Sequence, residues 1–242
     1  PIVLITGSSG LIGSAIVENL SKDYETVGLD MTFPEGEKTK IGDFIECDLT
    51  RDESVDLALE TVKQRHGDRL ASVIHLAAYY DFAREPSEMY DRLTVGGTRR
   101  LLSELQKFDA EQFVFSSTIL VQEPSEEGEK ITESSPLEDE PWDYPRSKIE
   151  TEKLIRRERG NIKTVVLRIG GVYNEDTHTV PIAQQIARIY EKQFESYFYP
   201  GDASHGQAFV HLEDLADCVR SVIVRREALP DSDVFIVAEP DL

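Results

Sequence analysis

The sequence lacks any apolar run long enough to span a membrane, and no signal peptide precedes its first apolar segment. It has only two cysteines, Cys47 and Cys218, and they stand far apart. Sparse, distant cysteines are typical of reduced thiols rather than of a disulfide framework. We therefore expect a cytoplasmic protein with no membrane association.

Basic residues and metal-ligand clusters are also scarce. The 26 Lys and Arg residues are outnumbered by 46 Asp and Glu residues, which gives a formal net charge of −20. This charge repels the phosphates of nucleic acids and anionic lipids, so neither is expected as a partner. The five histidines are scattered and no Cys/His group has zinc spacing, so no metal site is predicted. The expected partner is a small-molecule substrate.

The chain does contain an apolar, strand-like run at its start, residues 1–6, followed by a glycine-rich turn. Gly7 would make the tight turn off the strand, and Gly10 would let a phosphate approach the backbone. Gly13 would let the next helix pack closely on the sheet. Free N–H groups at the start of that helix suit a pyrophosphate. The pattern predicts a dinucleotide site, with an ordinary strand-to-helix turn as the alternative.

An acidic residue ends the second predicted strand, residues 24–30. Asp30 lies 17 residues after Gly13, where a dinucleotide fold places a carboxylate that binds the adenosine ribose hydroxyls. Met31 and Thr32 follow it, and no Lys or Arg lies close by to accommodate a 2′-phosphate. The sequence therefore favours NAD over NADP, although Asp30 could instead merely end a strand.

Strands alternate with helices along the whole chain, which predicts a parallel sheet covered on both faces. We expect an α/β fold with a doubly wound parallel sheet. The expected strands are residues 1–6, 24–30, 43–49, 70–76, 112–118, 163–169, 207–211 and 234–238. The expected helices are residues 14–20, 50–66, 87–108, 143–159, 181–193 and 213–226. Gly96 and Gly97 weaken the third of these helices, so close packing is expected there.

A phenol and an ammonium group stand four residues apart, at Tyr144 and Lys148, on one face of a predicted helix. A lysine beside a tyrosine favours the phenolate and lowers a pKa that is otherwise about 10. Such a tyrosine can exchange a proton with a substrate hydroxyl. Thr118, at the end of a predicted strand, could hold the substrate oxygen beside it.

The motifs together resemble an extended short-chain dehydrogenase/reductase of the NAD-dependent epimerase/dehydratase family. The matching stretches, in family order, are residues 6–13, Asp30, 48–49, 75–78, 115–118, Tyr144 with Lys148, 167–173 and 209–216. The resemblance implies a Rossmann fold, Thr118 orienting the substrate oxygen, Tyr144 as acid/base, and Lys148 binding the nicotinamide ribose. It also implies hydride transfer to and from NAD.

The resemblance further implies a set of residues that contact NAD. These are Gly7, Ser9, Gly10, Leu11, Ile12, Gly13, Asp30, Met31, Asp48, Leu49, Leu76, Ala77, Ala78, Ser116, Tyr144, Lys148, Ile169 and Val172.

Several substrate-side positions depart from the family pattern. Thr94 stands where asparagine is usual, and residues 121–123 read Val-Gln-Glu where Val-Tyr-Gly is usual. Residues 168–170 read Arg-Ile-Gly in place of Arg-Pro-Gly, and residues 173–174 read Tyr-Asn in place of Tyr-Gly. These departures lie on the expected substrate side, so the family pattern does not by itself define the substrate of this chain.

Three residues are candidates for substrate contact. Tyr80 and Phe82, in the aromatic run after the fourth strand, could line a pocket. Arg168 could bind an anionic group. The alternatives are packing under a loop for the aromatics and structural ion pairing for the arginine.

These observations lead to an expected enzyme: an NAD-dependent epimerase/dehydratase-type oxidoreductase acting at a secondary alcohol or ketone, of a sugar or nucleotide-sugar. One alternative is a dehydrogenase or reductase of a less polar, sterol- or terpenoid-like alcohol. Another is an NAD-binding sensor or scaffold without turnover. An RNA-binding derivative of the fold conflicts with the net charge.

The resemblance also suggests a domain division and an assembly. Residues 1–170 would form the NAD-binding domain, to which residues 207–238 return, and residues 171–206 with the C-terminal end would form a small substrate lobe. That lobe would be either naturally short or truncated. Helices 87–108 and 143–159 would form a four-helix homodimer interface.

Overall fold

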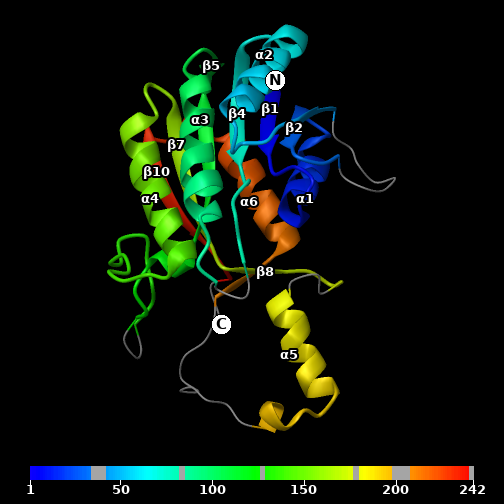
Figure 1. The fold of residues 1–242 in the computed structure, drawn as a ribbon, viewed down its shortest axis with the longest axis vertical. Coiled ribbons are helices and arrows are strands. Elements are labelled where there is room, and N and C mark those ends of the chain that lie inside the picture. Colours follow the sequence, from blue (N-terminus) through cyan, green and yellow to red (C-terminus); the bar gives the residue numbers. More distant parts are fainter. Residues whose placement is uncertain (34–41, 82–84, 126–128, 177–179, 198–207, 240–242) are drawn as a thin grey trace.

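A computed structural model describes residues 1–33, 42–81, 85–125, 129–176, 180–197 and 208–239. Its centre is an eight-stranded sheet in the order β10-β7-β6-β4-β1-β2-β3, with β5 paired to β4 off this path (Figure 1). The strand pairs within it are parallel. The strands are β1 Ile2–Thr6, β2 Glu25–Asp30, β3 Asp43–Glu46, β4 Arg69–His75, β5 Asp109–Ala110, β6 Gln112–Thr118, β7 Lys163–Ile169 and β10 Ser232–Val237.

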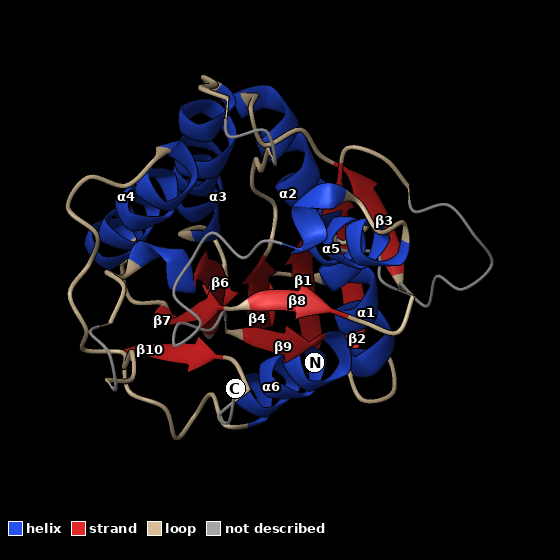
Figure 2. Cartoon of the chain, turned by 90° about the horizontal axis from the view of Figure 1, so that it is seen from below, coloured by secondary structure: helices blue, strands red, loops and turns tan. Residues whose placement is uncertain are grey.

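Two helical layers cover the sheet, and Figure 2 shows the strands between them. Alternate side chains of each buried strand enter opposite layers: Leu4 of β1 joins one apolar core, whereas Val3 and Ile5 join the other. The first core includes side chains of α2 Asp52–His66, α3 Gly96–Leu105 and α4 Asp143–Glu158. The second includes those of α1 Leu11–Leu20 and α6 Leu212–Val224. The predicted doubly wound fold is confirmed.

The strand order reverses direction at the centre of the sheet. From β1 the chain builds outward through β2 and β3, then returns to place β4 on the other side of β1. Thr6 at the end of β1 lies in register with Leu29 of β2 and His75 of β4. Doubly wound folds bind ligands outside the carboxyl ends of the strands at such a reversal, so this edge is where a cofactor is expected.

The helix predicted over residues 87–108 is divided in the structure. A π-helical segment, η1 Tyr90–Val95, precedes α3. The close packing expected at the glycine pair is present, because a Cβ on Gly97 would lie 3.1 Å from the Cβ of Leu49. A larger side chain there would push the helix off the segment that follows β3.

Smaller elements lie at the carboxyl edge of the sheet. The short strands β8 Gly171–Tyr173 and β9 Phe209–His211 form a separate parallel pair. The 3-10 helix η2 Ile119–Val121 follows β6 directly. Helix α5 Val180–Tyr190 and the turn η3 Phe194–Tyr197 project away from the sheet (Figure 1).

Candidate functional site

The glycine-rich turn between β1 and α1 has the geometry that a dinucleotide needs. Gly7 adopts φ +72°, and a Cβ there would lie 2.9 Å from the backbone N of Ala77. A Cβ on Gly13 would lie 2.1 Å from the carbonyl O of Gly7, so only glycine allows α1 to pack this closely. At Gly10 a Cβ would meet only the Gly7 carbonyl O, at 3.5 Å. The residues therefore fit a pyrophosphate at the start of α1, with open space above Gly10.

Asp30 is tied to this turn by the backbone. Its carboxylate accepts hydrogen bonds from the N–H groups of Ser9 at 2.9 Å and of Met31 at 2.7 Å. The Ser9 hydroxyl donates to the carbonyl O of Thr32 at 2.6 Å. These contacts hold a carboxylate at the end of β2 beside the phosphate turn, which is the arrangement that binds ribose hydroxyls.

Asp48 and Leu49, predicted among the NAD contacts, follow β3. The Asp48 carboxylate accepts hydrogen bonds from the backbone N–H and the hydroxyl of Thr50, at 2.9 and 2.7 Å. Burial raises the pKa of Asp48, but the Thr50 hydrogen bonds outweigh it and hold the pKa below its ordinary value. Leu49 is buried under Gly97.

A buried histidine that sequence reasoning assigned no role lies at the end of β4. His75 Nδ1 lies 2.7 Å from Oγ1 of Thr6, and its Nε2 lies 2.8 Å from Oγ1 of Thr98. Thr98 donates its single hydroxyl proton to the carbonyl O of Thr94, so it must accept from Nε2. In a neutral ring Nδ1 then carries no proton and accepts from the Thr6 hydroxyl, which itself accepts from the N–H of Ala77.

This network assigns His75 a single neutral tautomer, with its proton on Nε2. Burial first, and then the charge of Lys148, lower the pKa of His75 to about 3. The ring therefore links the β1 turn to α3 without carrying charge. The sequence did contain a signal for this role of His75. It was a histidine at the end of an apolar strand, together with threonines at the ends of neighbouring elements.

The three predicted catalytic residues come together at the carboxyl end of β6. Lys148 and Tyr144 lie in the first two turns of α4, and a hydrogen bond joins the side chains of Tyr144 and Thr118. Lys148 Nζ donates to the carbonyl O of Ser116 at 2.7 Å. It lies 5.8 Å from the centre of the Tyr144 ring and 4.8 Å from that of Phe115.

The electrostatics of this group differ from the prediction. Burial, and to a lesser degree Tyr80, raise the pKa of Tyr144, and the Thr118 hydrogen bond only partly offsets this rise. Burial lowers the pKa of Lys148 to about 7. The prediction that Lys148 brings the Tyr144 pKa toward neutrality is wrong, because burial of the phenol raises its pKa and the Lys148 ammonium points at the Ser116 carbonyl O instead.

Aromatic rings surround the Tyr144 phenol. Tyr80 packs edge-on against it with ring centres 4.6 Å apart, Trp142 lies at 5.6 Å, and Tyr90 lies at 6.4 Å. Tyr80 is 43% exposed, so this aromatic wall reaches the surface. The sequence reasoning named Tyr80 but missed Trp142 and Tyr90. The predicted contact residue Phe82 lies outside the described residues.

Arg168 does not face a substrate space. Its guanidinium is buried and pairs with the Glu152 carboxylate, with Nη2 2.9 Å from Oε2, and also donates to the carbonyl O of Glu133 at 3.2 Å. The structure thus favours the structural alternative over substrate binding. Ile169 and Val172, which were predicted to contact NAD, lie at the end of β7 and in β8.

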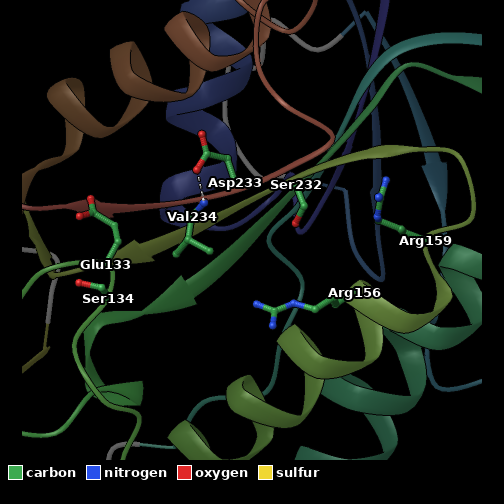
Figure 3. A pocket seen from close by; sticks show the side chains of 7 residues that line it. All are labelled: Glu133, Ser134, Arg156, Arg159, Ser232, Asp233 and Val234. Carbon is green, nitrogen blue, oxygen red and sulfur yellow. Dashed lines mark hydrogen bonds between the residues drawn. The ribbon is translucent and has the colours of Figure 1, made fainter.

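A cavity of about 510 Å³ lies elsewhere, at the edge strand β10 (Figure 3). It is lined by Glu133, Ser134, Arg156, Arg159, Ser232, Asp233 and Val234. The start of β10 and the end of α4 border it, which is the opposite edge of a parallel sheet from the carboxyl ends of the strands. It is separate from the site built around Tyr144.

Comparison with known proteins identifies the family. The sequence model of the NAD dependent epimerase/dehydratase family matches residues 3–238. The chain belongs to this family. It is therefore an NAD-dependent enzyme of the extended short-chain dehydrogenase/reductase type, as the motifs predicted.

Individual relatives are distant. The chain is similar to a UDP-glucose 4-epimerase of Erwinia amylovora, at 28% identity over 89% of this chain and 71% of that protein. It is also similar to a decarboxylating sterol-4-alpha-carboxylate 3-dehydrogenase of Candida albicans, at 26% identity over 80% of this chain and 57% of the relative. A solved structure of Thermus thermophilus UDP-glucose 4-epimerase in complex with NAD superposes with a TM-score of 0.74 at 25% identity, covering 100% of this chain and 78% of that one.

One further property concerns the length and the apolar character of the helices. In the described ranges, no helix combines the length and the apolar character that crossing a bilayer requires.

Proposed function

We propose that this family member carries out epimerase/dehydratase-type chemistry at a secondary alcohol or ketone of a sugar, with Tyr144 as the acid/base. The observation that carries the proposal is the convergence of Tyr144, Thr118 and Lys148 at the end of β6, beside the reversal of strand order. Such a site can move a proton on a substrate hydroxyl, and NAD, when bound, would supply the hydride-transfer chemistry.

The residues of the chain have different roles in the proposed reaction. Thr118, bonded to the phenol, is placed to share a substrate oxygen with Tyr144. Burial raises the pKa of the phenol and favours its neutral form, so Tyr144 is set to donate a proton to a developing alkoxide. The aromatic wall of Tyr80 and Trp142 excludes water from one side of the phenol.

The cofactor role rests on the glycine turn and Asp30. Gly7, Gly10 and Gly13 would hold the pyrophosphate, and Asp30 would accept hydrogen bonds from the adenosine ribose. Ser9, Leu11, Ile12, Met31, Leu76, Ala77, Ala78, Ser116, Ile169 and Val172 complete the proposed NAD contacts, together with Asp48 and Leu49. A carboxylate already tied to the turn disfavours a 2′-phosphate, which supports NAD over NADP.

The proposed substrate class is a nucleotide-sugar, because UDP-glucose 4-epimerases are among the relatives. A less polar alcohol is the second candidate. The half-exposed ring of Tyr80 beside Tyr144, and the sterol dehydrogenase among the relatives, favour it.

One experiment separates these candidates from a sensor without turnover. The purified protein with NAD is offered UDP-glucose, UDP-galactose and a 3-hydroxysterol, and product and reduced nicotinamide are both measured. Interconversion of the sugars supports the first proposal, and net reduction of NAD by the sterol supports the second. Turnover that is unchanged in Tyr144→Phe would refute the role of the phenol, and NAD binding without turnover on a wider alcohol panel would favour the sensor.

We also propose the finer features that the family likeness suggests. These are a homodimer through the η1–α3 and α4 helices, a substrate lobe over residues 171–206, and a cytoplasmic location that suits the unpaired Cys47 and Cys218. The proposed dimer face is charged: Arg146 lies 3.8 Å from Asp91, and Arg99 lies 3.4 Å from Glu158. Sedimentation at low and high salt tests it, since a purely monomeric protein at all concentrations would refute it.

A further inference from the structure

A buried carboxylate, that of Glu152, lies close to the proposed catalytic residues, and both of its oxygens accept hydrogen bonds from side chains. Glu152, one turn after Lys148 on α4, is 7% exposed. Its Oε1 accepts from the Ser117 hydroxyl at 2.5 Å and from Arg168 Nε at 3.3 Å, and its Oε2 accepts from Arg168 Nη2 at 2.9 Å. Three donors from β6 and β7 therefore hold it in one position.

Stability alone is a weak explanation for this pair. Removing two charges from water costs several kcal/mol, and well-packed apolar side chains of similar volume often stabilise a core equally well. The position of the pair is informative, however. Ser117 lies between Ser116, whose carbonyl O accepts from Lys148, and Thr118, which bonds to Tyr144.

Among the groups of the described residues that face Lys148, Glu152 is the one that carries a negative charge. From α4 it is faced by Glu152 and Tyr144, from β4 by His75, and from β6 by the Ser116 carbonyl. His75 is neutral because burial lowers its pKa to about 3, and Tyr144 is neutral because burial raises its pKa. Arg168 on β7 reaches this neighbourhood through its contact with Glu152.

We propose that Glu152 is a positioning residue that favours the charged form of Lys148 and its direction toward the end of β6. The proposal rests on the proposed role of Lys148 in the reaction. Burial lowers the pKa of Lys148 to about 7 and the charge of Glu152 opposes that effect, so without the carboxylate the amine would be neutral to a still larger extent. A neutral amine donates a weaker hydrogen bond to the Ser116 carbonyl O than an ammonium does.

The test is to titrate Lys148 in the intact chain. Lysine methylene signals are followed by heteronuclear NMR against pH, with the Lys148 signal assigned by its loss in Lys148→Arg. In Glu152→Gln we expect the midpoint to fall by about one pH unit, as for removal of a nearby opposite charge that is not in direct contact. With an identified substrate, the alkaline limb of kcat/KM should move to lower pH by the same amount.

Two further variants keep the test decisive. Glu150→Gln makes the same charge change on an exposed residue of α4 that lies 3.7 Å from Arg146, and it should leave the midpoint in place. Glu152→Gln/Arg168→Met removes both buried charges, so it should fold even where the single variant does not, and its midpoint should also fall.

An unchanged midpoint in the folded Glu152 variants would overturn the proposal and leave the pair a purely structural contact. Because this readout needs no turnover, it is independent of the catalytic assignment. A shifted midpoint with activity unaffected by Lys148→Arg would instead refute the proposed function while sparing the electrostatic link.

Discussion

The backbone N–H of Ser9 donates a 2.9 Å hydrogen bond to Oδ2 of Asp30, so the phosphate turn and the end of β2 form one unit before any cofactor arrives. Replacing Asp30 with Ala should therefore weaken NAD binding in two ways, by removing the ribose acceptor and by loosening the turn. Charged hydrogen bonds contribute about 1.5–3 kcal/mol, so we expect roughly a 10- to 100-fold rise in the Kd for NAD by calorimetry. Asp56→Asn, on the exposed side of α2, is the matched control and should leave the Kd unchanged.

Substitutions of Gly13 and Gly10, two glycines of the turn, should have different effects on stability and on NAD binding. Gly13→Ala places a Cβ 2.1 Å from the Gly7 carbonyl O, and overpacking of this kind costs about 1–3 kcal/mol or more of the free energy of unfolding. Gly10→Ala meets only one atom, at 3.5 Å, so its unfolding midpoint in denaturant should barely move. Its NAD affinity should nevertheless fall, because the Cβ occupies the approach of the pyrophosphate. Equal loss of stability in both variants would contradict this distinction.

Tyr144→Phe should separate chemistry from folding. General acid/base catalysis contributes about 100- to 10,000-fold, so kcat should drop by that range while the Kd for NAD changes little. The lost hydrogen bond to Thr118 should lower the free energy of unfolding by no more than about 1.5 kcal/mol. Tyr24→Phe, away from the site in the loop before β2, is the control whose kcat should equal that of the parent protein.

The buried His75 predicts a specific pH dependence of stability. Its pKa is about 3 in the folded chain against an ordinary 6.5, so the folded state excludes a proton that the unfolded state binds. Its contribution to stability is fully present above pH 6.5 and is lost as the pH falls toward 3, at roughly 1 kcal/mol per pH unit.

Urea unfolding at pH 7 and pH 5 measures this effect. His75→Gln should be less stable at pH 7 because the Thr6 and Thr98 hydroxyls lose their aromatic partner, but it should lose less stability than the parent between the two pH values. Parallel pH profiles for parent and variant would mean that the ring is protonated in the folded protein.

The strands were the best predicted part of the chain. The apolar run that ends in hydroxyl side chains predicted the bounds of β6, and the run that ends in Ile predicted those of β7. Both predictions match the structure at both ends of the strand. Three-residue β8 was missed because a run so short carries no periodicity. The helix expected from residue 50 begins later in the structure: α2 begins at Asp52, and the Thr50 hydroxyl donates to Asp48.

The site was predictable in its residue types but not in its charges. Spacing alone placed Tyr144 and Lys148 on one helix face, and the structure keeps them there. No local pattern in the sequence indicated that Glu152 on α4 would pair with Arg168 on β7. None indicated that burial would determine the pKa of the Tyr144 phenol. Both depend on which elements pack together, and a single sequence does not reveal that.

The position of β1 has a consequence for biosynthesis. Strand β1 lies at the centre of the finished sheet, yet its partner β4 is made only after β2, β3 and α2. Until then one hydrogen-bonding edge of β1 and its apolar neighbours stay unpaired in the nascent chain. Slowing translation before β4 should therefore increase dependence on chaperones, whereas a pause placed after β7 should matter less.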